Sequence, residues 1–131
     1  MEELLLLGID PKIVKEMVDV NPYIKDMDKD EIDEKVNLLK SINCSEKEII
    51  NIISSNPMYL DSVSGDIIDL ISYMQHIGFS NLNILFDSNP FVLNMYSSEI
   101  KDYIDNRINN GEEIDYIVDD LESNPFLFDE I

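Results

Sequence analysis

Apolar residues in this chain recur in pairs four residues apart, and each pair stands at the same distance before an Asn-Pro dipeptide. The residues eight and four positions before the proline are apolar in all four copies: Val14/Val18, Ile49/Ile53, Leu82/Phe86 and Ile117/Leu121. A spacing of i, i+4 places both members of a pair on one face of an α-helix. The pattern therefore predicts four helices, each with a buried stripe and each ending near an Asn-Pro dipeptide.

The four dipeptides follow one another at intervals of 35, 33 and 35 residues: Asn21-Pro22, Asn56-Pro57, Asn89-Pro90 and Asn124-Pro125. A residue before proline is disfavoured in the α region, so we expect each helix to end at the asparagine. We also expect that asparagine to cap a short new turn whose first residue is the proline. The apolar residues after the proline are predicted to fill the gap between stacked units: Tyr23, Ile24; Met58, Tyr59, Leu60; Phe91, Val92, Leu93; Phe126, Leu127, Phe128.

A second helix is expected before each of these. Gly8, Asn43, Gly78 and Gly111 precede the prolines by 12 or 14 residues, and both residue types tolerate the left-handed conformation that ends a helix. Apolar residues recur ahead of them at helical spacing: Leu4, Leu7; Ile32, Val36, Leu39, Ile42; Ile67, Ile71, Met74, Ile77; Ile100, Ile104. The sequence predicts one all-α domain, residues 1–131. It is a short superhelical solenoid of four helix-turn-helix repeats of about 33–35 residues, approximately 1–27, 28–63, 64–96 and 97–131, each ending in a 3₁₀ turn at Asn-Pro.

This repeat of helix, Gly, helix and Pro-aromatic/aliphatic-Leu resembles that of the mitochondrial transcription termination factor (mTERF) family. The stretches that carry the resemblance are "LISYMQHIGFSNLNILFDSNPFVL" (70–93) and "LLKSINCSEKEIINIISSNPMYL" (38–60). The resemblance implies two α-helices and a short 3₁₀ turn per repeat, stacked into a curved superhelix. It also implies nucleic-acid binding along a basic concave groove, in organelle gene expression.

The charge of the chain favours a different partner. The net charge is −19, and residues 48–131 carry two basic and sixteen acidic side chains, with no Lys or Arg between Lys47 and Lys101. Such a surface repels phosphate backbones and attracts basic partners. We therefore interpret the chain as a non-catalytic interaction module for a protein partner with a basic surface. Two alternatives are nucleic-acid binding as in the mTERF family, and an acidic mimic of nucleic acid that inhibits a DNA- or RNA-handling enzyme.

The last predicted helix, residues 112–122, carries a row of acids. Ile114, Ile117, Val118 and Leu121 would form its buried stripe, which leaves on one exposed row Glu112, Asp115, Asp119 and Glu122. This row is either a solvated face or an acidic ridge that docks a basic partner. In the helix before it, Arg107 and Asn110 replace residues that are apolar in the other repeats, and we expect Arg107 to neutralise Asp102 or Asp105.

Other polar residues give no sign of chemistry. Asp26, Asp28 and Asp30 match positions 1, 3 and 5 of a calcium loop, but Glu31 stands where that loop needs glycine and Asn37 where it needs glutamate. The acids are better explained as the start of a helix. His76 and Cys44 have no evident catalytic partners, so we expect no enzyme, metal or cofactor.

Three further expectations concern location and assembly. One cysteine allows no internal disulfide and suits a reducing compartment. The opening "MEELLLLGID" lacks the features of a signal or transit peptide, and no apolar stretch approaches the roughly 20 residues that span a bilayer. We therefore expect a cytoplasmic protein without membrane contact. Because "FLFDEI" leaves Phe126, Phe128 and Ile131 at an outer repeat, we also expect self-association through exposed repeat ends.

Overall fold

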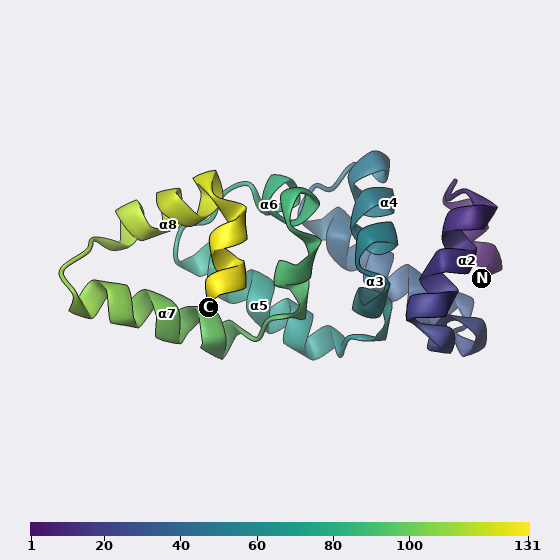
Figure 1. Ribbon diagram of the computed structural model, residues 1–131, viewed down its shortest axis with the longest axis horizontal. Helices are drawn as coiled ribbons and strands as arrows, with labels where there is room; N and C mark the ends of the chain where they lie inside the picture. The colour runs from purple at the N-terminus through teal and green to yellow at the C-terminus, as the bar shows by residue number, and fades with distance from the viewer.

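The computed structural model describes residues 1–131 and is entirely helical (Figure 1). Two α-helices and one 3₁₀ turn (η) follow one another four times, as the sequence predicts. The bounds are α1 Glu2–Leu6, α2 Pro11–Val20 and η1 Pro22–Asp26; α3 Lys29–Ser41, α4 Glu46–Ser55 and η2 Pro57–Asp61; α5 Ser64–His76, α6 Leu82–Ser88 and η3 Pro90–Asn94; α7 Ser97–Asn109, α8 Ile114–Ser123 and η4 Pro125–Glu130. The predicted all-α repeat architecture is confirmed.

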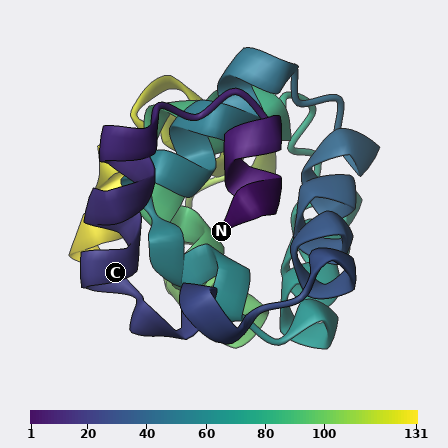
Figure 2. The same ribbon diagram turned by 90° about the vertical axis from the view of Figure 1, so that its right-hand side faces the viewer.

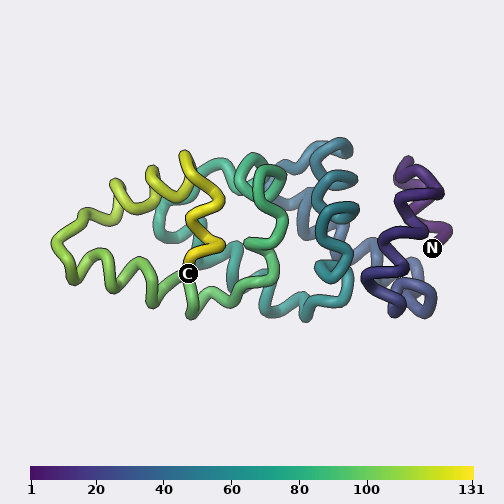
Figure 3. The backbone as a smooth tube through the Cα atoms, viewed as in Figure 1, coloured from purple at the N-terminus to yellow at the C-terminus, as the bar shows by residue number.

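The repeats stack along the long axis of an elongated molecule (Figure 1). First helices pack on first helices (α3 on α5, α5 on α7) and second helices on second helices (α2 on α4, α4 on α6), while η1, η2 and η3 pack in sequence on one another. Viewed along the long axis, the helices surround a common centre (Figure 2). The tube in Figure 3 shows the sharp change of direction between α8 and the turn η4 that follows it. This is the neighbour-to-neighbour packing of a solenoid. None of the helices has the length and apolar character needed to cross a bilayer.

The helix boundaries follow from local chemistry that the sequence carries. Asp10 accepts a hydrogen bond from the Lys12 backbone N–H (2.8 Å) at the start of α2. At the start of α4, the Glu48 N–H donates to Ser45 Oγ (3.1 Å) and the Ser45 N–H donates to Glu48 Oε1 (2.8 Å), which completes a capping box. Between the helices of each repeat one residue has positive φ, for example Asn43 at 68°. The predicted left-handed turn residues are therefore confirmed.

One apolar core of 33 buried residues runs through all four repeats. All eight members of the apolar pairs that precede the Asn-Pro dipeptides are buried in it. The prediction fails at the first residue after each proline, because these side chains are exposed: Tyr23 65%, Met58 45%, Phe91 55% and Phe126 65%. In each 3₁₀ turn the next residue faces inward instead, as Tyr59 and Val92 do. Ile114 is also more exposed than predicted, because it is the first residue of α8.

Candidate functional site

Each second helix ends at the asparagine that precedes proline. The Asn56 N–H still bonds to the Ile52 carbonyl (2.9 Å), but the backbone of Asn56 has φ −131° and ψ 72°, outside the α region. The other three asparagines have nearly the same geometry. The following proline then begins the 3₁₀ turn. The predicted helix stop is confirmed, and its cause is the steric restriction that proline places on the residue before it.

The asparagine side chains do not cap the 3₁₀ turns, so this prediction is wrong. Instead, the amides of the first three asparagines donate to the proline carbonyl of the next repeat: Asn21 Nδ2 to Pro57 O (3.1 Å), Asn56 Nδ2 to Pro90 O (3.1 Å) and Asn89 Nδ2 to Pro125 O (3.0 Å). All three asparagines are buried. We call these three inter-repeat bonds the asparagine ladder. It satisfies buried backbone carbonyls and fixes each turn against its successor.

Two ladder asparagines make a second bond to the end of the next turn, where Asn56 reaches Asn94 Oδ1 (3.0 Å) and Asn89 reaches Asp129 Oδ1 (3.1 Å). Asn124 behaves differently. It is exposed, and its amide bonds back to the carbonyl and side chain of Asp120, both at 3.1 Å. The Asn-Pro dipeptide therefore has an inter-repeat role in the first three repeats and a local one in the fourth.

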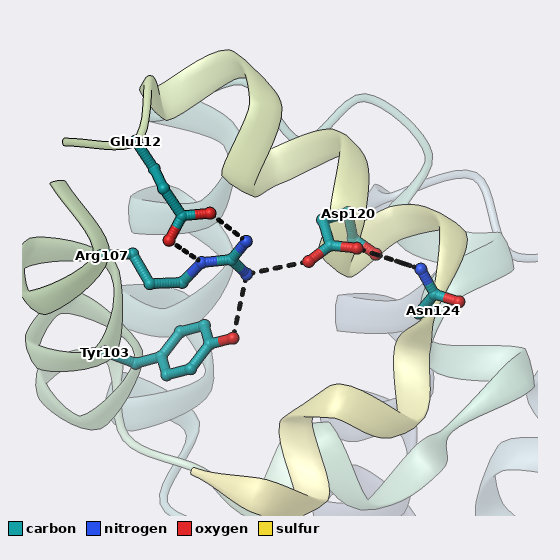
Figure 4. A network of polar contacts seen from close by, with 5 residues as sticks. All are labelled: Tyr103, Arg107, Glu112, Asp120 and Asn124. Carbon is teal, nitrogen blue, oxygen red and sulfur yellow. Dashed lines mark hydrogen bonds and ion pairs between the residues drawn. The ribbon is translucent and has the colours of Figure 1, made fainter. Parts of the chain in front are cut away.

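Arg107, near the end of α7, binds a cluster of polar groups between α7 and α8 (Figure 4). Its Nε and Nη2 donate to the two carboxylate oxygens of Glu112 (2.8 and 2.6 Å), and its Nη1 donates to Asp120 Oδ2 (2.9 Å) and Tyr103 Oη (3.0 Å). The guanidinium also lies over the rings of Tyr103 and Tyr116, 5.6 and 5.9 Å from their centres. The bidentate pair of hydrogen bonds from Arg107 to Glu112 is the strong form of the Arg–carboxylate interaction.

The predicted partners of Arg107 are wrong. Asp105 is bound by Lys101 (2.5 Å) on the same helix, and Asp102 makes no ion pair. The turn at Gly111 brings α8 back along α7, so acids that follow Arg107 in the chain reach it. Hydrogen bonds from Arg107 hold the pKa of the Glu112 carboxyl below its usual value, and the same bonds raise the pKa of Arg107. Both groups are therefore charged at neutral pH.

The Arg107 cluster occupies positions that are apolar and buried in the first three repeats. The residues equivalent to Arg107 are Leu4, Leu39 and Met74; those equivalent to Glu112 are Ile9, Cys44 and Phe79; those equivalent to Asp120 are Met17, Ile52 and Leu85. The fourth repeat therefore holds a polar cluster between its helices where the first three repeats hold apolar side chains. Phe128 is buried, while Phe126 and Ile131 are exposed. Self-association through repeat ends stays a prediction, and the outer apolar surface available for it is smaller than the sequence indicates.

The predicted acidic row is incomplete. Asp115 and Asp119 are exposed on α8 and Glu122 is partly buried there, and none of the three forms an ion pair. Glu112 does not belong to the row, because α8 begins only at Ile114 and Arg107 binds the Glu112 carboxylate. We therefore define the acidic ridge as Asp115, Asp119 and Glu122. Whether a partner binds it stays a prediction.

The basic residues of the same half of the chain are already engaged. Residues 48–131 contain only Lys101 and Arg107, and both are held in ion pairs, with Asp105 and with Glu112 and Asp120 respectively. No unpaired positive side chain remains in this half to meet a phosphate. The sequence shows that positively charged residues are scarce in this half. The structure adds that both of them, Lys101 and Arg107, are bound by carboxylates of the same chain.

The remaining candidate residues have structural explanations. Burial raises the pKa of the Cys44 thiol to about 12, with a smaller contribution from the charges of Glu48 and Asp87, so the thiol is protonated at neutral pH. His76 is exposed at the end of α5. Asp28 caps α3 by accepting from the Glu31 N–H (2.9 Å), Asp30 lies in the first turn of that helix, and Asp26 ends η1. No group of three or more His, Cys, Asp or Glu side chains is arranged to hold a metal ion.

These features define a short α-helical repeat protein with an acidic surface, in which each unit joins two α-helices to a 3₁₀ turn. The chain belongs to the mTERF family, whose model, described as mTERF, matches residues 1–110. The match confirms the family resemblance of the sequence. It ends at Asn110, just before Glu112 and Asp120, two of the polar residues that distinguish the fourth repeat. A comparison with curated proteins gave no significant match.

Proposed function

We propose that this protein is a non-catalytic helical-repeat module that binds a protein partner through a basic surface of that partner. One observation carries the proposal. In residues 48–131, sixteen acids face two basic residues, and both basic residues are used internally. An acidic surface of this kind accelerates the approach of positively charged molecules and repels negatively charged ones.

The acidic ridge is the part of α8 that we assign to this binding. Asp115 and Asp119 are exposed and form no ion pair, so both side chains are accessible to a partner. Lysine or arginine side chains of the partner would gain charge-assisted hydrogen bonds there without breaking any bond of the free protein. A protonated, buried Cys44 thiol and a single exposed His76 support a non-catalytic role. One unbridged cysteine is compatible with a reducing compartment such as the cytoplasm.

The mTERF family suggests nucleic acid as the alternative partner, but nucleic-acid binding depends largely on Lys or Arg side chains that neutralise phosphates and displace the counterions held by them. Residues 48–131 contain only two such side chains, and both are in ion pairs. The test is affinity capture from native cell extract at low and high salt, with and without nuclease. We expect a basic protein to be retained after nuclease treatment and released at high salt. Loss of the captured material on nuclease treatment would favour nucleic-acid binding, and displacement of the captured protein by nucleic acid would favour the acidic mimic.

A matched pair of variants assigns the binding to α8. The substitutions Asp115→Asn, Asp119→Asn and Glu122→Gln remove three charges from the acidic ridge. The control, Asp69→Asn, Asp102→Asn and Glu130→Gln, removes three exposed and unpaired charges elsewhere. We expect the ridge variant to lower the affinity for the captured protein at least about tenfold, because several charge pairs act together. The control should change it less than about threefold, and equal effects would contradict the assignment to α8.

A further inference from the structure

An exposed apolar side chain occupies the same place in every repeat, directly after the proline. Tyr23, Met58, Phe91 and Phe126 are all between 45% and 65% exposed, although each is followed by a buried or partly buried residue. Single exposed apolar residues are common on protein surfaces and need no explanation. Recurrence at one position of every repeat distinguishes these four from scattered exposed residues.

Two of these residues line a groove that crosses the first three repeats. The groove has a volume of about 360 Å³ and lies between α2, the end of α4, and the turns η2 and η3. Val20 (60% exposed), Met58 and Phe91 are exposed apolar residues of its lining. Asn56 and Asn94 also line it and bond to each other, so the asparagine ladder ties η3 to the end of α4 beside the groove. A volume of this size accommodates a few apolar side chains.

The groove also contains the one buried polar side-chain atom of the molecule that has no hydrogen-bond partner, Ser54 Oγ. Buried hydroxyl groups are normally bonded, and each exception requires an explanation. In the free protein this single serine hydroxyl beside the groove therefore lacks a partner.

The charges around the groove define the chemistry of its occupant. Glu16 lies in its wall, and no Lys or Arg lines it. Glu16 and Asp19 stand six and three residues before Pro22, the positions that Asp119 and Glu122 of the acidic ridge hold before Pro125. The second helices of the first and last repeats thus present carboxylates at matching places. Glu16 is the one charged residue of the lining, so an occupant that fits combines apolar side chains with lysine or arginine beside Glu16.

We propose that this groove binds an amphipathic α-helix of the protein partner, with an apolar stripe seated on Val20, Met58 and Phe91 and with basic residues beside the stripe. The inference rests on the function proposed above and names the surface and the kind of segment recognised. A helix fits better than an extended strand because it satisfies its own backbone hydrogen bonds. The present surface is entirely helical and offers no sheet edge to pair with an extended chain.

The probe is a synthetic helical peptide of about 16 residues, with leucine at i, i+3, i+4 and i+7 and lysine on both flanks of that stripe. A peptide of the same composition with the leucines dispersed around the helix is its control. Fluorescence anisotropy of the labelled peptides measures their affinity for the full chain. We expect the striped peptide to bind at least about tenfold more tightly than the dispersed one, because only the stripe fits the groove.

Variants of the protein locate the binding. Phe91→Ser and Met58→Ser should each weaken binding of the striped peptide about tenfold, since apolar anchors dominate such interfaces. Ile68→Ser is the matched control, because Ile68 is also exposed (48%) but lies on α5 and outside the groove. It should change the affinity less than about twofold. Circular dichroism establishes that each variant is folded. Chemical-shift changes at Val20, Met58 and Phe91 in the unaltered protein provide a readout that needs no variant.

The outcomes separate this inference from the proposed function. If both lysine peptides bind equally and Phe91→Ser has no effect, the groove is not the site, and the preference for a basic partner stands. If no lysine peptide binds at low salt, the proposed function and the groove both fail. Selective binding of the striped peptide, lost in Phe91→Ser and kept in Ile68→Ser, supports both.

Discussion

At the scale of single residues, the asparagine before each proline serves two purposes. Its backbone ends a helix, and its side chain bonds to the next repeat. The first purpose is predictable from the dipeptide alone, because the effect of proline on its neighbour is local. The second is not, because the acceptor of the Asn21 amide is a carbonyl 36 residues later. Only the stacking of the repeats brings donor and acceptor together, and a cap within the turn was the reasonable but wrong expectation.

The asparagine ladder leads to a prediction for stability. We expect Asn56→Ala to lower the free energy of unfolding by about 1–3 kcal/mol, because the buried Pro90 carbonyl and the Asn94 side chain lose their partner. Asn124→Ala is the control in the same dipeptide. Asn124 is exposed and bonds only within its own repeat, so its loss should cost about 0.5 kcal/mol or less. Urea denaturation followed by far-UV circular dichroism measures both, and equal losses would contradict an inter-repeat role.

The ion pair of Arg107 with Glu112 leads to a prediction for pH. A carboxyl whose pKa is lower in the folded than in the unfolded protein stabilises the fold above its unfolded value, about 4.3 for glutamate. That stabilisation disappears as the pH falls through the folded pKa. The pKa of Glu112 is lowered in this way. The stability difference between the natural protein and Glu112→Gln should therefore be constant above about pH 5 and shrink below about pH 4.

Thermal unfolding between pH 7 and pH 3 tests this expectation. Glu113→Gln is the control, because Glu113 is the next residue, is exposed and has no ion-pair partner. A difference for Glu112→Gln that grows on acidification would show that Arg107 does not stabilise the ionised carboxylate.

At the scale of elements, the fourth repeat differs from the others because a polar cluster around Arg107 lies between its two helices, α7 and α8. The sequence reveals the departure, since Arg107 and Asn110 interrupt the apolar pattern. The sequence does not reveal which acids bind Arg107. Helical spacing identifies neighbours on the same helix, whereas Asp120 lies on α8 and reaches Arg107 only because the turn at Gly111 reverses the direction of the chain. The elements themselves were predictable because their start and stop signals are local, as the capping box at Ser45 illustrates.

Restoring apolar residues in this repeat should create a surface that associates. The triple substitution Arg107→Leu, Glu112→Ile and Asp120→Leu gives the fourth repeat the side-chain types that the inner repeats bury. We expect a concentration-dependent rise in mass, because these three positions are partly exposed and exposed apolar side chains promote association. Light scattering against the unaltered protein measures this rise.

A second triple variant tests the role of position in that experiment. Lys101→Leu, Asp102→Ile and Asp105→Leu add the same side chains on another part of α7. Association to the same extent would mean that added hydrophobicity, and not the repeat position, is responsible.

At the scale of the whole molecule, the large negative charge opposes the compact folded state. The net charge is −19 in a chain of 131 residues, so the folded state suffers repulsion among its own carboxylates. The charge was evident from composition, but the groove was not. Val20, Met58 and Phe91 are separated by more than thirty residues each, and the pattern alone assigned Met58 and Phe91 to the interior.

Salt should therefore stabilise the protein while it weakens binding of a basic partner. Raising NaCl from about 0.02 M to about 0.2 M shortens the screening length to less than about 10 Å and reduces the repulsion. We expect the melting temperature to rise by about 3–6 °C, which corresponds to roughly 1 kcal/mol for a chain of this size. The variant Asp69→Asn, Asp102→Asn and Glu130→Gln should respond less, because it carries fewer charges. A melting temperature that falls with salt would contradict this account.

The proline that follows each ladder asparagine has a further consequence for chemical ageing. Asparagine usually converts to aspartate when the backbone nitrogen of the following residue attacks the side-chain carbonyl, and proline lacks the N–H that this reaction requires. At Asn21, Asn56 and Asn89 such a conversion would replace an amide donor with a carboxylate facing a proline carbonyl. The same dipeptide that ends the helix thus closes this deamidation route at the bond between repeats.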